Sequence, residues 1–273
     1  MSYRHILAEE GITEVSVLPM ACATLTRPYL LGDCIERYRS LILFLVPYRV
    51  KSEDEARNVS EYAVPRDYHA YMKTLFARIL PQMTALYGDT LGFSDHSPID
   101  ERSAAVLSGL GVIGKNGLLI NEQYGSYVFI GEMITEAAPS TLGYLPIGEG
   151  KHFCDACDAC LRACATGCLS DYGKPCLSAV TQKKGELTEE ERALILRVGC
   201  AWGCDLCQSA CPMNKHVKDT PIAFFREARI PRLSVKDVLE MDEKTFALRA
   251  FSWRGRKTVL RNLELLEERK DHT

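Results

Sequence analysis

Cysteine is the residue type whose spacing in this chain points most clearly to chemistry. The sequence holds 12 cysteines, and ten of them lie between Cys154 and Cys211. The first run consists of Cys154, Cys157, Cys160 and Cys164, and the second of Cys204, Cys207 and Cys211 followed by Pro212. Thiolates at such short intervals are typical of a metal centre. The cysteines therefore predict bound metal rather than a disulfide framework.

The intervals within the two runs favour iron–sulfur clusters. Two, two and three residues separate the cysteines of the first run, and two and three separate those of the second. In bacterial ferredoxins, three close thiolates bind one 4Fe-4S cluster and the fourth reaches across to the other. Structural zinc also takes four thiolates, but usually from two Cys-x-x-Cys pairs separated by a longer loop. We therefore assign Cys154, Cys157, Cys160 and Cys211 to cluster one, and Cys164, Cys204 and Cys207 to cluster two.

Cluster two still lacks one ligand after this assignment. Cys200 is nearest to the second run and is slightly favoured by spacing alone. Cys176, in the loop after the first run, is the alternative, and Cys168 is a weaker third candidate. The spacing leaves the choice open.

The overall composition is that of an ordinary protein and says less about function than the cysteines do. The 273 residues are 47% hydrophobic and 25% charged with a net charge of -3, which is typical of a globular protein and not of a bulk polyanion binder. The apolar run Leu41 to Val46 is too short to span a bilayer, and Met1 to Glu10 lacks the apolar core of a signal peptide. We therefore expect a cytoplasmic protein with no membrane association.

The remaining patterns predict the elements that must position the cysteines. Glu14 to Pro19, Leu41 to Pro47 and Tyr124 to Gly131 are expected to be strands, and Tyr68 to Gly88 a helix kinked at Pro81. Gly143 to Gly150 is expected to be a linker. Thr188 with Glu191 forms a capping box for a helix through Leu196, and Ser234 caps another helix in a helical region after Pro221. The expected domains are 1–150, 151–220 and a helical tail, 221–273.

The first half of the chain contains several further motifs. They are Tyr62-Ala-Val-Pro-Arg66-Asp67-Tyr68-His69, Asp95-His-Ser-Pro-Ile-Asp-Glu101-Arg102, Gly109-Leu-Gly111, Gly114-Lys115-Asn116, Gly125-Ser126, and Gly131-Glu132 with Thr135. Together these motifs resemble the epoxyqueuosine reductase family. Gly203-Cys-Asp-Leu-Cys-Gln-Ser-Ala-Cys-Pro-Met-Asn214 continues the resemblance, which runs nearly end to end in family order.

This resemblance implies a cobalamin-dependent, two-cluster iron–sulfur enzyme related to reductive dehalogenases. Its members reduce epoxyqueuosine in transfer RNA to queuosine. The implied fold class is α/β (α+β): a nitroreductase-like cobalamin-binding domain, a bacterial ferredoxin-like double 4Fe-4S domain and a short helical tail. A flavodoxin or ferredoxin is the implied electron donor.

The resemblance also suggests site residues. Asp95 aligns with the family's general acid, although by sequence alone an N-cap or Asx turn before Pro98 explains it as well. Cys176-Leu177-Ser178 matches the family loop that completes cluster two, with Cys200 as competitor. The implied cofactor-binding residues are Tyr62, Arg66, Tyr68, His69, Gly109, Gly111, Lys115 and Ser126. Gly114 joins the two glycines as a position where backbone can approach a ligand closely.

The chain departs from the family pattern at Pro65, Val112, Ala165 and the additional Cys168. It also stops at Thr273, before the helical repeats with which longer members hold transfer RNA. Five cations near the end, Arg249, Arg254, Arg256, Lys257 and Arg261, could contact phosphates or simply form a solvated helix face. Two alternatives therefore stay open: the same machinery acting on a small epoxide, halide or activated alkene, and a ferredoxin-like carrier or corrinoid-reactivating partner.

Overall fold

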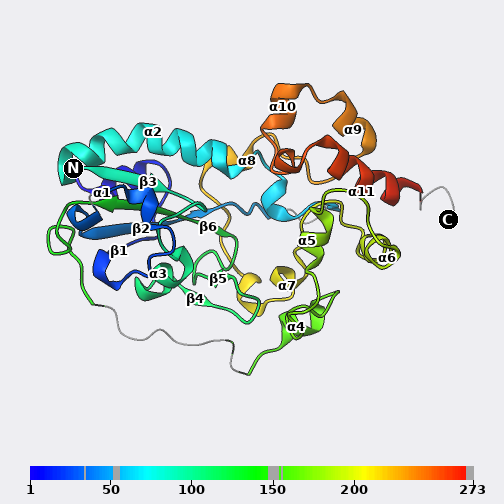
Figure 1. The fold of residues 1–273 in the computed structure, drawn as a ribbon, viewed down its shortest axis with the longest axis horizontal. Helices are drawn as coiled ribbons and strands as arrows, with labels where there is room; N and C mark the ends of the chain where they lie inside the picture. Colours follow the sequence, from blue (N-terminus) through cyan, green and yellow to red (C-terminus); the bar gives the residue numbers. More distant parts are fainter. Residues whose placement is uncertain (34, 52–55, 147–153, 155, 269–273) are drawn as a thin grey trace. The chain divides into compact units, whose positions relative to one another are not determined.

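The computed structural model describes residues 1–273 except 34, 52–55, 147–153, 155 and 269–273 (Figure 1). The chain forms two compact units, each assembled from separated segments. Unit one contains Met1–Tyr48, His69–Ala156 and Val217–Ile222, and unit two contains Arg49–Tyr68, Cys157–His216 and Ala223–Thr273. This division differs from the three consecutive domains expected from sequence, because the chain crosses from unit to unit more than once.

A four-stranded antiparallel sheet forms the centre of unit one. Its order is β1 (Val15–Pro19), β2 (Ser40–Pro47), β6 (Val128–Thr135) and β3 (Thr90–Phe93). All eight residues of β2 are buried, as expected for a central strand covered on both faces. The strands expected at Glu14 to Pro19 and Leu41 to Pro47 are confirmed. The third begins later than expected, because Asn121 and Gly125 pair with each other in a tight turn before β6.

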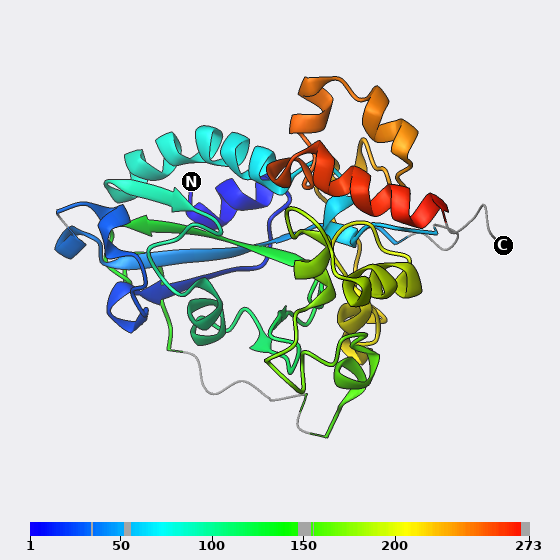
Figure 2. The same cartoon turned by 45° about the vertical axis from the view of Figure 1, so that its right-hand side comes forward.

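Helices cover both faces of this sheet (Figures 1 and 2). The helix α2 (Tyr68–Tyr87) lies along the face that carries Phe44, whose ring meets Phe76 edge to face at 6.2 Å. Leu43, one residue earlier and therefore on the opposite face, packs in the same cluster as Ala104 of α3 (Glu101–Leu107). The predicted helix at 68–88 is confirmed, and it continues through Pro81. The short α1 (Tyr3–Glu9) and the hairpin of β4 (Val112–Ile113) and β5 (Leu119–Ile120) complete the regular elements.

Two glycines make the Phe44–Phe76 packing possible. A Cβ atom added to Gly131 of β6 would lie 2.3 Å from the Phe44 ring, and one added to Gly92 of β3 would lie 2.4 Å from the Phe76 ring. Real Cβ atoms do not approach other atoms so closely. The glycine of the Gly131-Glu132 motif therefore has a packing reason within unit one.

Unit two is helical, with short elements around two apolar clusters. Its α-helices are α4 (Ala159–Ala163), α5 (Leu177–Thr181), α6 (Glu189–Val198), α7 (Leu206–Ser209), α8 (Ala223–Arg226), α9 (Val235–Glu240), α10 (Glu243–Ala247) and α11 (Arg256–Glu268). The fully buried Trp202 lies in the larger cluster and meets Phe251 edge to face at 6.2 Å. The capping box of Thr188 with Glu191 is confirmed, and Ser234 caps α9 through a second box with Asp237.

Short single-turn helices connect the larger elements. They are η1 (Met20–Cys22), η2 (Pro28–Leu31), η3 (Ile35–Arg37), η4 (Glu61–Ala63), η5 (Pro212–Asn214) and η6 (Ser252–Arg254). Half of the linker expected at Gly143 to Gly150, residues 147–150, lies outside the described residues. Within the described part of the chain, no helix combines the length and apolarity that crossing a bilayer requires.

Candidate functional site

Unit two contains the cysteines from Cys157 onward, and members of both runs lie there on a pair of short helices. Cys160 lies on α4 and Cys207 on α7, and these two helices pack against each other (Figure 1). Cys211 is buried and precedes η5, whose first residue is Pro212. The fold thus packs together two helices whose cysteines are more than 40 residues apart in sequence, as shared ligation of two clusters requires. Among the described residues, no three side chains of Cys, His, Asp or Glu are placed to hold one metal ion.

The thiols in this region differ in their protonation. Burial raises the pKa of Cys204 to about 12, and the neighbouring Cys200 and Cys176 thiols add to this effect. Burial also acts to raise the pKa of Cys164, but bonds with the Thr166 hydroxyl, the Leu169 amide and the Cys168 thiol outweigh it and bring the value to about 6. A buried neutral thiol such as Cys204 becomes a thiolate when a metal supplies compensating charge. The donor set therefore fits a thiolate-ligated cluster.

The candidates for the last ligand occupy different surroundings. Cys200 donates its thiol hydrogen to the carbonyl oxygens of Trp202 and Gly203, at 3.4 and 3.3 Å. Burial raises its pKa to about 11. Cys176 is exposed at the N-terminus of α5 and is close enough to raise the pKa of Cys204. Cys168 contacts Cys164, sulfur to sulfur, at 3.5 Å. Both Cys176 and Cys200 lie near Cys204, and the choice of Cys176 over Cys200 stays a prediction.

The candidate acid Asp95 lies in unit one, two residues after β3. Its φ of 65° is in the left-handed region, which residues other than glycine adopt rarely. Its amide donates to Glu101 Oε2 at 3.2 Å, and its Oδ2 lies 3.5 Å from His69 Nε2. The side chains of Asp95 and His69 are 63% and 55% exposed, so both can reach a ligand. The N-cap alternative for Asp95 is wrong, because Asp100 caps α3.

The other residues of the upstream motif have partners within unit two. The Tyr62 hydroxyl accepts from Trp202 Nε1 at 3.0 Å, and burial raises the pKa of Tyr62. Arg66 pairs with Glu227 at 3.1 Å and lies 4.4 Å from the centre of the Phe224 ring. Tyr68 is the first residue of α2 and is half-buried. Among the motif residues predicted to bind the cofactor, His69 lies beside Asp95.

The glycines of the second motif lie close to other parts of the chain. A Cβ atom on Gly111 would come within 2.5 Å of the Ile120 carbonyl oxygen, and one on Gly114 within 2.7 Å of the Ile120 side chain. Gly109 ends α3 with a φ of 79°. The small size of Gly111 and Gly114 is thus required by the β4–β5 hairpin. Lys115 is exposed and Ser126 is buried.

Most of the cations near the end of the chain are bound to the chain itself. Arg249 is buried and donates to the carbonyl oxygens of Val64 and Ala228, and burial lowers its pKa. Arg256 pairs with Glu243 at 3.0 Å, and Arg261 donates to the Lys183 and Gly185 carbonyl oxygens. Arg254 lies 3.7 Å from the centre of the Trp253 ring, and Lys257 is exposed. The five residues do not form one solvated basic face.

Sequence reasoning missed two groups of polar residues. Asp205 bonds with residues of the segment before the Tyr62 motif, including Ser60 and Glu61. Glu132 is fully buried, and neither of its carboxylate oxygens has a hydrogen bond within the described structure. Both lie in motifs that the resemblance rests on, but their charge alone predicts an exposed position.

Comparison with known proteins defines the class of protein first. A family described as a 4Fe-4S double cluster binding domain matches residues 153–214. Together with the cysteine spacing, this makes the chain an iron–sulfur protein in which an α/β unit accompanies a double-cluster domain.

Longer matches identify the family. A Cyclobacterium marinum epoxyqueuosine reductase is 30% identical over 244 residues, which cover 81% of this chain and 74% of the relative. The chain belongs to the epoxyqueuosine reductase family. Relatives from Lactococcus garvieae and Listeria monocytogenes are 28% and 31% identical over 84% and 79% of this chain. The chain spans 68% and 56% of their lengths.

Solved structures agree with this membership. The epoxyqueuosine reductase of Streptococcus thermophilus matches 96% of this chain and 79% of its own, with 26% identity and a TM-score of 0.76. An epoxyqueuosine reductase with an epoxyqueuosine-modified tRNA stem loop matches the same shares, with 25% identity and a TM-score of 0.75. The α/β (α+β) fold class and the double-cluster domain expected from sequence are confirmed.

Proposed function

We propose that this protein is an oxidoreductase that reduces epoxyqueuosine in transfer RNA to queuosine, with Asp95 as the proton donor. One observation carries the proposal: the family's cluster-binding cysteines share a chain with an exposed carboxylate held on a left-handed turn beside His69. Non-glycine residues in such strained turns cluster at functional sites. The relative with a bound tRNA stem loop supports the substrate.

Two kinds of cofactor are part of this proposal. The ligands of cluster one are Cys154, Cys157, Cys160 and Cys211, and those of cluster two are Cys164, Cys176, Cys204 and Cys207. When bound, the clusters would supply electrons singly, and cobalamin, implied by the family, would supply a strongly reducing cobalt centre. In unit one, Asn116 Nδ2 is buried without a hydrogen bond among the described atoms, and this donor fits an amide-bearing corrin.

The chain's own residues handle the protons. Converting an epoxide to an alkene consumes two electrons and two protons and releases the oxygen as water. Asp95 gives a proton to that oxygen, and His69, 3.5 Å away, is placed to stabilise the resulting carboxylate when it carries a charge. The amide of Asp95 is held by Glu101, so the turn is fixed before the substrate arrives.

A small-molecule epoxide is the second candidate substrate. The observation in its favour is that Arg249, Arg256 and Arg261 are bound within the chain and are not free to contact phosphates. A flavodoxin or ferredoxin is the proposed electron donor. Both this donor and transfer RNA are cytoplasmic molecules, and we place the protein in the cytoplasm for that reason.

Anaerobic reconstitution followed by turnover tests the proposal. We expect about eight irons per chain, a base-off cobalamin spectrum, and conversion of epoxyqueuosine in a tRNA stem loop. Asp95→Asn is expected to lower turnover by about 10² to 10⁴ while the iron content stays unchanged. Conversion of a free epoxide with none on the stem loop would favour the second candidate. Full turnover by Asp95→Asn would contradict the assigned proton donor.

A further inference from the structure

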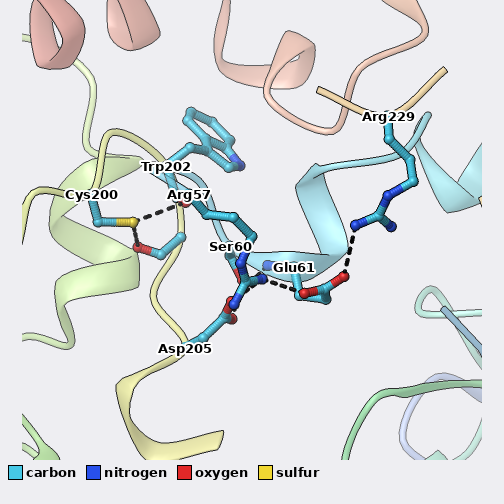
Figure 3. A network of polar contacts seen from close by, with 8 residues as sticks. Arg57, Ser60, Glu61, Cys200, Trp202, Asp205 and Arg229 are labelled. Carbon is cyan, nitrogen blue, oxygen red and sulfur yellow. Dashed lines mark hydrogen bonds and ion pairs between the residues drawn. The ribbon is translucent and has the colours of Figure 1, made fainter. Parts of the chain in front are cut away.

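A polar network in unit two surrounds the residue between two cluster cysteines. Asp205 lies between Cys204 and Cys207, and Figure 3 shows its carboxylate beside Arg57, Ser60 and Glu61. The Ser60 hydroxyl donates to Oδ1, the Glu61 amide donates to Oδ2 at 2.6 Å, and Arg57 approaches Oδ2 at 3.2 Å. The Asp205 side chain is only 9% exposed. One buried carboxylate thus receives three donors from one short segment.

The network extends to a second carboxylate. Arg57 also pairs with Glu61, and Glu61 Oε1 accepts from Arg229 at 3.3 Å. The Glu61 side chain is 6% exposed. Two guanidinium groups therefore balance two carboxylates, and loss of one partner would leave a buried charge uncompensated.

The backbone of the same segment pairs with the start of the cysteine loop. The Ser60 amide donates to the Trp202 carbonyl at 2.8 Å, and the Ala201 amide donates to the Asn58 carbonyl at 2.6 Å. Gly203 has a φ of 73°, and a Cβ atom there would lie 2.5 Å from Ser60 Cβ. Residues 57–62, which we term the cradle segment, therefore hold residues 201–205 through both main chain and side chains.

Helix capping, the usual role of an aspartate at an N-cap, does not account for the contacts of Asp205. Asp205 occupies the N-cap of α7, where an aspartate side chain normally accepts from the first turn of the helix. It makes no such capping bond. Its carboxylate is committed to the cradle segment instead.

We propose that Asp205 is the positioning residue of cluster two. Its carboxylate anchors the Cys204–Cys207 loop to the cradle segment and, balanced by Arg57, sets the charge beside that cluster. This inference rests on the cluster-two ligands proposed above and is independent of the substrate. Cluster potentials follow local charge and hydrogen bonding, so the network is expected to set the potential of cluster two.

Two substitutions of opposite charge test the proposal in the reconstituted full-length protein. Asp205→Asn leaves Arg57 uncompensated by this carboxylate, and the added positive charge favours the reduced cluster. The reduction potential of cluster two is therefore expected to become more positive in this variant. Arg57→Gln retains the Ser60 and Glu61 donors to Asp205 but removes a cation, so the potential is expected to become more negative. Cluster one is expected to shift less in both variants.

The measurement is a redox titration of each cluster followed by electron paramagnetic resonance, with iron content determined for every sample. Asp242→Asn is the matched control, because it removes one exposed negative charge and keeps an N-cap side chain on α10.

Opposite shifts in the reduction potential of cluster two support the proposal. No shift in Arg57→Gln, or shifts of the same sign in both variants, would overturn it. If Asp205→Asn loses iron, the shift in Arg57→Gln alone decides. None of these readouts depends on turnover, so failure of the proposed substrate would leave the result intact.

Discussion

Cys176 and Cys200 are both candidates for the last ligand of cluster two, and their sulfur atoms have different surroundings. The Cys200 thiol donates to two carbonyl oxygens, and binding a cluster would break both hydrogen bonds. We expect Cys176→Ser to lose about half of the iron, since one of two four-iron clusters fails to form, and Cys200→Ser to retain nearly all of it. Iron and sulfide analysis of the reconstituted variants checks this. Loss of iron confined to Cys200→Ser would reverse the assignment. Equal iron content in the two variants would contradict it.

Glu132 gives unit one a dependence on pH. Burial raises the pKa of its carboxyl group from 4.5 to about 8, and the charge of Glu101 adds to this effect. Between these values the folded chain keeps a proton that the unfolded chain has lost, so this group makes the protein less stable as pH rises. Glutamine does not titrate. We therefore compare the free energy of unfolding of Glu132→Gln with that of the wild type. The variant's value minus the wild-type value is expected to be larger at pH 8 than at pH 5, by more than about 1 kcal/mol.

Urea unfolding of both proteins at the two pH values measures this difference. Taking the difference between variant and wild type at each pH removes the contribution of the other titrating groups. A difference independent of pH would mean that Glu132 is charged in the folded protein throughout this range.

Among the elements, strands β3 and β6 each carry a glycine where an aromatic ring packs against the sheet, and this packing leaves no room for a Cβ atom. Gly131→Ala would push a Cβ atom into the Phe44 ring, which is fully buried and cannot move away freely. We expect a loss of about 1–3 kcal/mol in the free energy of unfolding, typical of overpacking. Gly173→Ala is the control, because its Cβ atom meets only the end of the exposed Asp171 side chain. A chemical denaturation series compares the two, and equal stabilities would show that the sheet adjusts at no cost.

At the scale of the whole molecule, the interleaved segments make a prediction about loss of the clusters. The cradle segment is separated from the cysteine loop by about 140 residues but is bonded to it. Removal of iron is therefore expected to lower hydrogen-exchange protection at Ser60 as well as within 157–216, because bound metal stabilises the structure that binds it. Amides of β2 and β6, in the other unit, are expected to stay protected. Exchange measured by mass spectrometry with and without iron tests this, and unchanged exchange at Ser60 would contradict it.

Much of the local structure was predictable from residues close together in sequence. The cysteine intervals, the Thr188–Glu191 box and the apolar run at 41–47 depend on contacts within a turn of helix or along one strand. The position of β6 was less predictable, since the residues before it form a turn closed by Asn121 and Gly125. The arginines at 249, 256 and 261 could not be placed, because their acceptors are carbonyl and carboxylate groups elsewhere in the chain.

By itself, the sequence determined the cluster chemistry and the family, because thiolate spacing and ordered motifs are properties of neighbouring residues. The packing of the whole chain was needed to show that Arg49–Tyr68 belongs with the cluster unit, that Asp205 bonds to Ser60 and Glu61, and that the Cys200 thiol donates to two carbonyl oxygens. These features arise from contacts between distant segments. Such contacts depend on how the whole chain packs and on which groups lose water, and no local pattern of residue types carries that information.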